Sequence, residues 1–240
     1  MRRSAFRATV VLIALLATAF AQGPPVESGP FRQPDLVELV KLDPTIRLDI
    51  RYATKNNFLG KKVYKEKRAF LQRPAAEALV RVNQKLRAKG YGLIVFDGYR
   101  PWSVTKAFWD ATPPDKKIFV ADPARGSRHN RGCAVDLSLF DLKTGETVKM
   151  PSEYDEMTER SHINYECSND KAEFFREMLR VAMTSEGFNV YEPEWWHYDY
   201  KDWKEYPILN VKFSDVKCAK RSVQSPSFSL RSGPVTQPKG

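Results

Sequence analysis

Apolar positions recur along the chain at two spacings, which predict helices and strands in alternation. Residues 74–89 carry their apolar positions on one helical face, with proline near the start and Gly90 just past the end. A second helix is predicted over residues 170–185, where Asp170 and Glu173 form a capping box. Its expected core face consists of Phe174, Phe175, Met178, Leu179 and Ala182.

Strand patterns lie between these helices. The predicted strands are residues 48–52, 92–96, 137–140 and 188–200. We expect residues 137–140 to return as a hairpin to residues 147–150, with Gly145 in the turn. Residues 102–112 are expected to form a helix that covers the site described below. After the amino-terminal segment, the chain of roughly 200 residues can bury a full core and suits one domain.

The first 21 residues have the pattern of a secretory signal peptide. Three arginines precede or enter an apolar stretch over residues 8–16, and Ala19-Phe20-Ala21 offers a cleavage site before Gln22. A membrane anchor is disfavoured because the stretch is shorter than the ~20 residues that a spanning helix needs. We therefore expect an exported protein, periplasmic or secreted, with no integral membrane segment after cleavage. The export route stays open.

Composition divides the remaining chain into three parts. Residues 22–33 are rich in proline and glycine and predict a linker. Residues 34–216 are expected to form the domain. Residues 217–240 combine Ser, Pro, Lys and Arg without periodicity, which predicts a disordered basic tail.

Charge and cysteine content narrow the classes of partner. The formal net charge is +10, or about +7 without the arginines of the signal peptide. The basic residues are scattered, and export argues against nucleic acid as a partner. Solvated lysines that keep the protein soluble are the simplest explanation of the positive net charge. The three cysteines, Cys133, Cys167 and Cys218, cannot all pair within one chain, and a bridge from Cys167 to Cys218 stays an open alternative.

A candidate metal site begins in the run Ser127 to Asp136. His129 and Asp136 are seven residues apart, with Gly132 between them and an apolar run after them. This pattern indicates a loop that turns at glycine and enters a buried strand, carrying two metal-binding side chains to one end of it. His197, in the cluster Glu194-Trp195-Trp196-His197, offers a third ligand. Together they make a His2Asp set that leaves one position open on zinc.

Glu194 and Arg100 add candidate chemistry to this set. Zinc lowers the pKa of a bound water to roughly 7, and Glu194 is close enough in sequence to His197 to accept the proton of that water. Residues three apart point to opposite faces of an ideal strand, so sharing one site requires a bulge or turn. Arg100 follows a predicted strand and could stabilise an oxyanion. A structural salt bridge with Asp97 is the alternative.

Four separated blocks resemble the zinc-dependent D-alanyl-D-alanine dipeptidases, the vancomycin-resistance type of D-Ala-D-Ala metallopeptidase. The blocks are L-D-I-R-Y-A-T-x-x-N-F-x-G, D-G-Y-R-P, S-x-H-x-x-G-x-A-x-D and Glu194-Trp195-Trp196-His197, and the resemblance covers roughly residues 36–212. It implies an α+β fold with a central antiparallel sheet flanked by helices, of the kind shared with the hedgehog signalling domain.

The resemblance also implies a role for each matching residue. His129, Asp136 and His197 correspond to the ligands of one zinc ion, Glu194 to the general base and acid, and Arg100 to the residue that stabilises the tetrahedral intermediate. Ser127 corresponds to a serine close to the bound substrate.

Three functions are compatible with the sequence. The favoured one is zinc-dependent hydrolysis of the D-alanyl-D-alanine dipeptide to two D-alanines. A D,D-carboxypeptidase or endopeptidase that acts on longer peptidoglycan peptides is the first alternative. A non-catalytic, metal-stabilised wall-binding module is the second, disfavoured because ligands, base and arginine are all present. The oligomeric state is left open.

Overall fold

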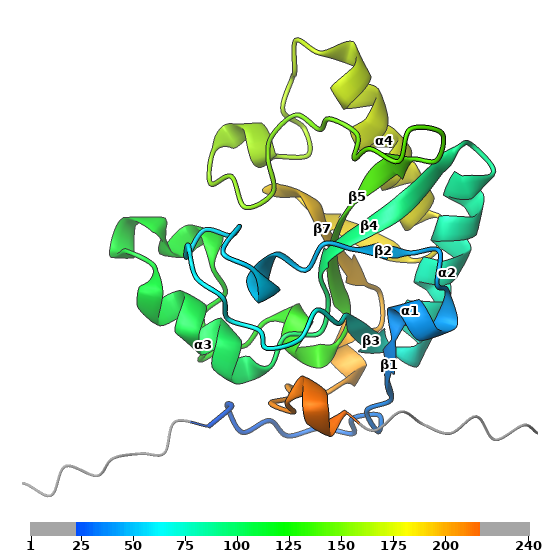
Figure 1. The fold of residues 1–240 in the computed structure, drawn as a ribbon. Coiled ribbons are helices and arrows are strands. Elements are labelled where there is room, and N and C mark those ends of the chain that lie inside the picture. Colours follow the sequence, from blue (N-terminus) through cyan, green and yellow to red (C-terminus); the bar gives the residue numbers. More distant parts are fainter. Residues whose placement is uncertain (1–22, 217–240) are drawn as a thin grey trace, which may run out of the picture.

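A five-stranded sheet forms the centre of the computed structural model, which describes residues 23–216 (Figure 1). The strand order is β2-β4-β5-β7-β6, and all neighbours are antiparallel except β2 and β4. The strands are β2 (Arg47–Leu48), β4 (Tyr91–Asp97), β5 (Ala134–Asp141), β6 (Phe188–Tyr191) and β7 (Glu194–Tyr200). The predicted α+β class with a central antiparallel sheet is confirmed.

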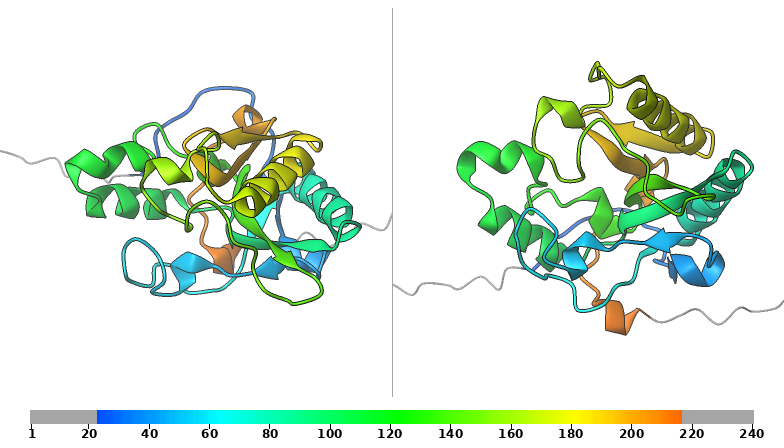
Figure 2. Two further views of the ribbon diagram at one scale, coloured as in Figure 1. Left: turned by 90° about the horizontal axis from the view of Figure 1, so that it is seen from above. Right: turned by 45° about the horizontal axis from the view of Figure 1, so that its top comes forward.

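Two helices pack against the sheet, and a third lies on the other side of the molecule. Figures 1 and 2 show α2 and α4 together on one side and α3 on the other. The helices are α1 (Leu39–Leu42), α2 (Arg73–Arg87), α3 (Trp102–Ala111) and α4 (Asp170–Thr184). A small second sheet pairs β1 (Leu36–Glu38) with β3 (Phe70–Gln72). Among the described residues, no helix is long and apolar enough to cross a membrane.

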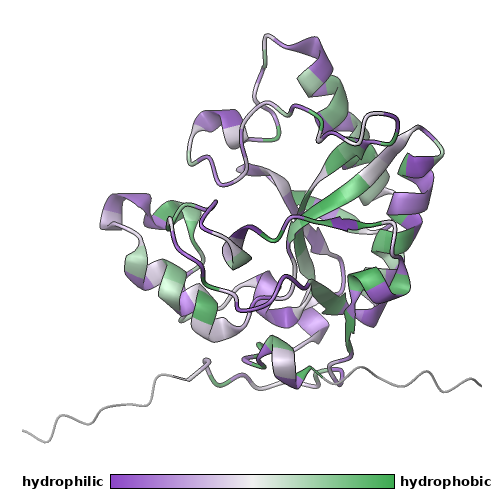
Figure 3. Ribbon diagram, viewed as in Figure 1, coloured by the Kyte–Doolittle hydropathy of each residue, from purple (hydrophilic) through white to green (hydrophobic). Residues whose placement is uncertain are grey.

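The central strand β5 separates the core from the candidate site. Val135, Leu137 and Leu139 are fully buried. Because successive side chains of a strand point to opposite faces, Asp136 points away from them. Figure 3 shows the apolar strands at the centre and the polar outer faces of the helices. The sheet therefore supplies a hydrophobic core on one face and a polar site on the other.

The start and one face of α4 differ from the prediction. Asn169 caps the helix, because its side chain accepts hydrogen bonds from the backbone N–H groups of Lys171 and Ala172. The proposed Asp170 capping box was therefore one residue late. Phe174 was also wrongly assigned to the core, since it is 57% exposed while its neighbour Phe175 is buried.

Two predicted strands are shorter than expected. Residues 188–200 form β6 and β7 rather than one strand, and the break falls at Pro193, which has no N–H to donate to a sheet. Residues 48–52 leave the sheet after Leu48 and continue as a 3-10 turn, Arg51–Ala53. The expected hairpin keeps its turn at Gly145 (φ 78°), but only one isolated bridge forms beyond it.

The segment at residues 23–33 has no helix or strand but is fastened to the domain. Glu27 accepts a hydrogen bond from the backbone N–H of Ile208 at 2.7 Å and pairs with Arg131. Cys133 is buried and Cys167 half-buried, and both are free thiols within residues 23–216. The predictions for residues 1–21 and 217–240, and for Cys218, lie outside the described residues.

Candidate metal centre

The loop before β5 delivers His129 to the sheet. Ser127 begins a 3-10 helix, Arg128–Arg131, and its hydroxyl oxygen accepts the backbone N–H of His129 at 3.2 Å. Gly132 then turns the chain with φ 68°. A Cβ there would lie 2.5 Å from the Leu36 side chain, so both the backbone angle and the available space require glycine. The predicted turn into a buried strand is thus observed.

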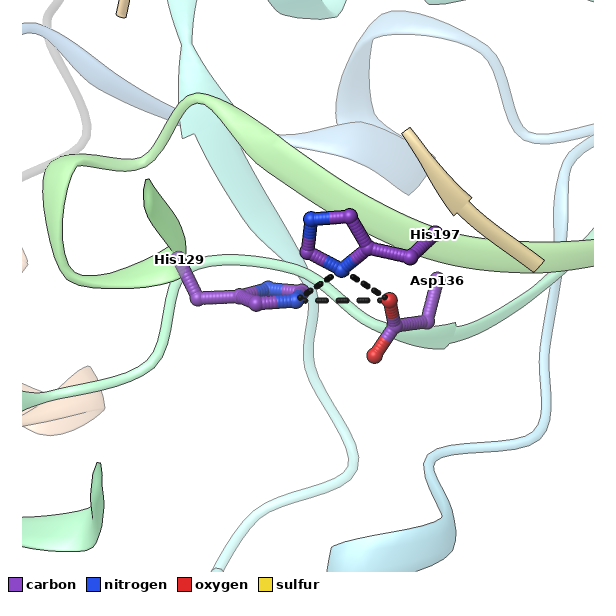
Figure 4. A group of neighbouring side chains, drawn as sticks. All are labelled: His129, Asp136 and His197. Carbon is purple, nitrogen blue, oxygen red and sulfur yellow. Dashed lines mark hydrogen bonds and ion pairs between the residues drawn. The ribbon is translucent and has the colours of Figure 1, made fainter. Parts of the chain in front are cut away.

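Three candidate ligands converge at the junction of β5 and β7. Asp136 pairs with His197 across the antiparallel strands, which puts both side chains on one face. An Asp136 oxygen lies 3.0 Å from Nδ1 of His197 and 3.3 Å from Nε2 of His129, and the two nitrogens are 3.1 Å apart (Figure 4). All three side chains are buried.

Acceptors on the outer nitrogens orient both imidazole rings. Nδ1 of His129 lies 2.7 Å from the carbonyl oxygen of Gly98, and Nε2 of His197 lies 3.0 Å from Asp199. Because a carbonyl can only accept, the His129 proton lies on Nδ1 and the Nε2 lone pair points toward the other two ligands. Metal-binding histidines are commonly held in this way.

The electrostatics of the cluster favour a cation at its centre. Burial disfavours the charged form of Asp136, but the two histidines outweigh it and hold the pKa of Asp136 well below its usual range. Burial also disfavours charged His197, yet Asp199 and Asp136 raise the pKa of His197 well above its ordinary value. Both shifts indicate that the three donor atoms favour positive charge between them. A divalent metal fits the same donors and would supply that charge in place of a proton.

Glu194 reaches the same cluster through an irregularity in the sheet. Val190 of β6 pairs with Tyr198, but the next residue, Tyr191, pairs with Glu194. Residues 195–197 therefore lie opposite no residue of β6, as in a bulge. An oxygen of Glu194 lies 3.8 Å from Nδ1 of His197, and burial raises the pKa of Glu194 to about 7. The sheet therefore has an irregularity where the sequence required a bulge or a turn.

Arg100 forms the salt bridge and also faces the site. Its Nε donates to one oxygen of buried Asp97 at 2.9 Å, and its Nη2 forms an ion pair with the same oxygen at 2.9 Å. Asp97 also accepts from the hydroxyl of Tyr64 at 2.9 Å. Nη2 of Arg100 lies 3.7 Å from Asp136. The two sequence interpretations of Arg100 are therefore compatible, because the structural pair fixes a guanidinium beside the candidate ligands.

Asp155 is a site residue that sequence reasoning missed. It adopts a left-handed backbone angle, φ 62°, which aspartate tolerates better than most residues. Its two oxygens accept from the Tyr52 hydroxyl at 3.1 and 3.0 Å. The hydroxyls of Tyr52 and Tyr154 lie 3.3 Å apart, and Tyr154 donates to Asp136 at 3.0 Å. Burial raises the pKa of Asp155 to about 8.

One cavity of about 550 Å³ connects these groups. All six residues proposed from the sequence line it. They are Arg100, Ser127, His129, Asp136, Glu194 and His197. Phe108 of α3 contributes to the wall, as expected for a helix that covers the site. Charged groups of both signs thus border one cavity next to three side chains that could bind a metal.

A buried His2Asp cluster with an adjacent carboxylate, at the edge of a mostly antiparallel sheet, defines the class of metal-dependent hydrolases. The chain matches the Peptidase_M15 family, described as D-ala-D-ala dipeptidase, over residues 32–218. It belongs to this family and is a metallopeptidase.

Individual relatives agree with this assignment. The D-alanyl-D-alanine dipeptidase of Escherichia coli (strain K12) is 34% identical over 180 residues, covering 75% of this chain and 92% of the relative. That of Enterococcus faecalis (strain ATCC 700802 / V583) is 38% identical over 187 residues, covering 70% and 92%. A solved LD-carboxypeptidase, LdcB, is 19% identical with a TM-score of 0.41, covering 78% of this chain and 80% of LdcB. That structural likeness is weak, and membership rests on the sequence matches.

Proposed function

We propose that the chain hydrolyses the D-alanyl-D-alanine dipeptide to two D-alanines, with one zinc ion held by His129, Asp136 and His197. The observation that carries the proposal is the convergence of these three donors beside Glu194 within one cavity. Two nitrogens and one carboxylate oxygen suit zinc and leave a position for water. The family and the relatives named above support the same substrate.

The residues around the ligands divide the chemistry between them. Bound zinc would lower the pKa of a coordinated water and polarise a carbonyl oxygen. Glu194 accepts a proton from the attacking water and then gives it to the amine that leaves when the C–N bond breaks. Arg100, held by Asp97, places fixed positive charge where the oxyanion develops. Ser127 lines the cavity, although its hydroxyl also caps the loop, and is proposed to lie near the substrate.

Asp155 suits the free amine of a dipeptide. Asp155 lines the cavity and accepts a hydrogen bond from Tyr52. Tyr52 and Tyr154 lie between it and the candidate ligand Asp136. An ammonium ion there would pair with the carboxylate and lower its pKa from about 8. We therefore propose Asp155 as the contact for the amine, which the sequence alone did not suggest.

Cleavage of longer peptides is the second candidate, because the cavity is large. Pockets of roughly 300–1,000 Å³ accommodate drug-sized ligands, and about 550 Å³ exceeds what two alanines need. A longer peptide would carry an amide in place of the free amine. Asp155 would then have no positive charge on the substrate to pair with.

The deciding experiment measures D-alanine release from two substrates, D-Ala-D-Ala and a longer peptide ending in D-Ala-D-Ala, with zinc and after chelation. We expect zinc-dependent release from the dipeptide, and an Asp155→Asn variant with a raised KM for it. Release from the longer peptide alone would move the function to a carboxypeptidase. No release from either substrate would refute the proposal.

We further propose that the enzyme acts outside the cytoplasm. The signal-peptide pattern of residues 1–21 supports export. A periplasmic or secreted dipeptidase would process products of cell-wall turnover. Detection of the uncleaved protein in the cytoplasmic fraction alone would contradict this localisation.

A further inference from the structure

Asp199 connects the outer nitrogen of His197 to Arg128, an arginine that lines the cavity. One oxygen of Asp199 lies 3.0 Å from Nε2 of His197, and the other lies 3.0 Å from Nη1 of Arg128. Asp199 is buried, whereas 38% of the Arg128 side chain is exposed. Arg128 also lines the cavity. One carboxylate therefore separates this guanidinium from a candidate metal ligand.

Aromatic rings hold the Arg128 side chain in place. Its guanidinium carbon lies 4.9 Å from the ring centroid of Trp203 and 5.9 Å from that of Tyr191. Both rings line the same cavity. Cation–π contacts and the ion pair with Asp199 together restrict the side chain before any ligand arrives. A preorganised group loses less conformational entropy on binding.

The other arginines that line the cavity are less suited to hold the carboxylate of a substrate. Arg100 and Arg131 are more deeply buried than Arg128, and Arg100 is already assigned to the oxyanion. Arg125 is exposed to solvent, where salt screens its charge. Arg128 alone among the four combines a buried partner that fixes it with a surface that solvent reaches.

We propose that Arg128 binds the free carboxylate of the substrate and makes the enzyme specific for peptides that end in an uncapped carboxylate. The inference rests on the proposed function, since it assigns a subsite for the same substrate. A guanidinium has five N–H donors in a planar fork, and the ion pair with Asp199 uses Nη1. The fork geometry matches the two oxygens of a carboxylate.

The arrangement of charges supports this assignment. A series of hydrogen-bonded groups begins at Asp155, passes through Asp136 and His197, and ends, by way of Asp199, at Arg128. A carboxyl group that an ammonium would ionise stands at one end, a guanidinium stands at the other, and two candidate metal ligands lie between them. A dipeptide likewise has an ammonium on one side of its scissile bond and a carboxylate on the other. The two sets of charges are complementary.

The test compares D-Ala-D-Ala with D-Ala-D-alaninamide, which keeps the scissile bond but lacks the carboxylate charge. We expect Arg128→Gln in the full, zinc-loaded chain to raise KM for the dipeptide about 10- to 100-fold, the range for a hydrogen bond to a charged group. KM for the amide should change by no more than about twofold, because that substrate has no charge to lose. The same difference should appear in calorimetric binding to an inactive Glu194→Ala background.

Two variants control for general electrostatics and for damage to the site. Arg125→Gln removes a positive charge from the same cavity and should leave both KM values near wild type. Arg128→Lys keeps the charge beside Asp199 without the fork, and should give an intermediate KM for the dipeptide. If Arg128→Gln fails to bind zinc, the test relies on Arg128→Lys. A KM of Arg128→Lys for the dipeptide equal to that of wild type would then overturn the assignment.

Three further outcomes would also overturn the role of Arg128. Arg128→Gln could raise KM for dipeptide and amide alike, Arg125→Gln could match it, or the active wild type could treat the two substrates equally. Wild-type protein that hydrolyses neither substrate would instead refute the proposed function, so the two failures are distinguishable.

Discussion

Replacement of Glu194 tests the proposed chemistry most directly. The carboxylate lies at the start of β7, 3.8 Å from Nδ1 of His197, and burial raises its pKa to about 7. A carboxyl group with a pKa near neutrality can both take a proton from water and release it to an amine. Glu194→Gln keeps the size of the side chain and removes this capacity.

The expected loss follows from the two proton transfers assigned to Glu194. General acid–base catalysis contributes typically about 10²–10⁴-fold to a rate, which corresponds to about 3–5 kcal/mol of activation free energy. We expect kcat to fall toward the upper end of this range, since one group acts as both base and acid. Zinc content should be unchanged, because the three convergent donors do not include Glu194.

The assay is D-alanine release from D-Ala-D-Ala by zinc-loaded wild type and variant, with metal content and melting temperature measured in parallel. Glu192→Gln is a matched control, because Glu192 lies two residues earlier and its side chain is 61% exposed. The reasoning is refuted if the folded, zinc-loaded Glu194→Gln enzyme retains more than about a tenth of wild-type kcat.

The pH profile provides a second check on the same group. Glu194 must be deprotonated to accept a proton, so kcat/KM of the wild type should rise with pH on the acidic side. A bound cation lowers the pKa of a neighbouring carboxyl group, which puts this limb at or below about pH 7. A rate that is independent of pH between 4 and 7 would contradict the role of Glu194.

Three further replacements test the surroundings of the site. Asp97→Ala leaves the buried guanidinium of Arg100 without its carboxylate partner, and should lower the free energy of unfolding by about 3–5 kcal/mol in urea denaturation. The raised pKa of Asp155, about 8, means that the folded state holds this proton more tightly than the unfolded chain, so its contribution to stability is full below about pH 4 and is lost as the pH rises to 8. The melting temperature of the metal-free wild type should therefore fall as the pH rises from about 4 to 8, and this fall should be smaller in Asp155→Asn. The same pH dependence in both proteins would contradict the raised pKa of Asp155. Gly132→Ala should destabilise more than Gly145→Ala, because both have positive φ but an added Cβ meets a packed leucine at 2.5 Å only at Gly132, the nearest atom to Gly145 being 3.6 Å away. We expect about 1 kcal/mol for Gly145→Ala and about 1–3 kcal/mol more for Gly132→Ala, and equal melting temperatures would exclude this reasoning.

The sequence predicts the loop and the strand that carry His129 and Asp136 because the signals for these elements are local. A turn glycine between His129 and Asp136, followed by an apolar run, indicates a loop that enters a buried strand, and Gly132 and β5 have this arrangement. The position of Arg100 after a short apolar run was likewise readable, since β4 ends three residues before it. Turn chemistry and burial are properties of a few consecutive residues.

Asp155 could not be found in this way. It lies in a polar segment without periodicity, and the contact that joins it to Tyr52 spans 103 residues of sequence. Only the folded chain shows that this loop returns to the cavity. The role of Arg128 could not be predicted either. Arg128 lies within the motif from Ser127 to Asp136, but its partner Asp199 lies on β7. Long-range pairs between charged groups leave no pattern in a single sequence.

Glu194 and His197 are three residues apart on one strand, yet an irregular pairing of β6 and β7 brings both side chains to the same site. Regular pairing of β7 would place residues three apart on opposite faces. Instead β6 moves from Val190 paired with Tyr198 directly to Tyr191 paired with Glu194, so the intervening residues of β7 bulge. His197 is held by its pairing with Asp136 on β5, whereas Glu194 is placed by the short turn from β6. The sheet therefore positions the candidate metal ligands and the turn positions the carboxylate, so that changes in the turn should alter kcat while leaving metal affinity intact.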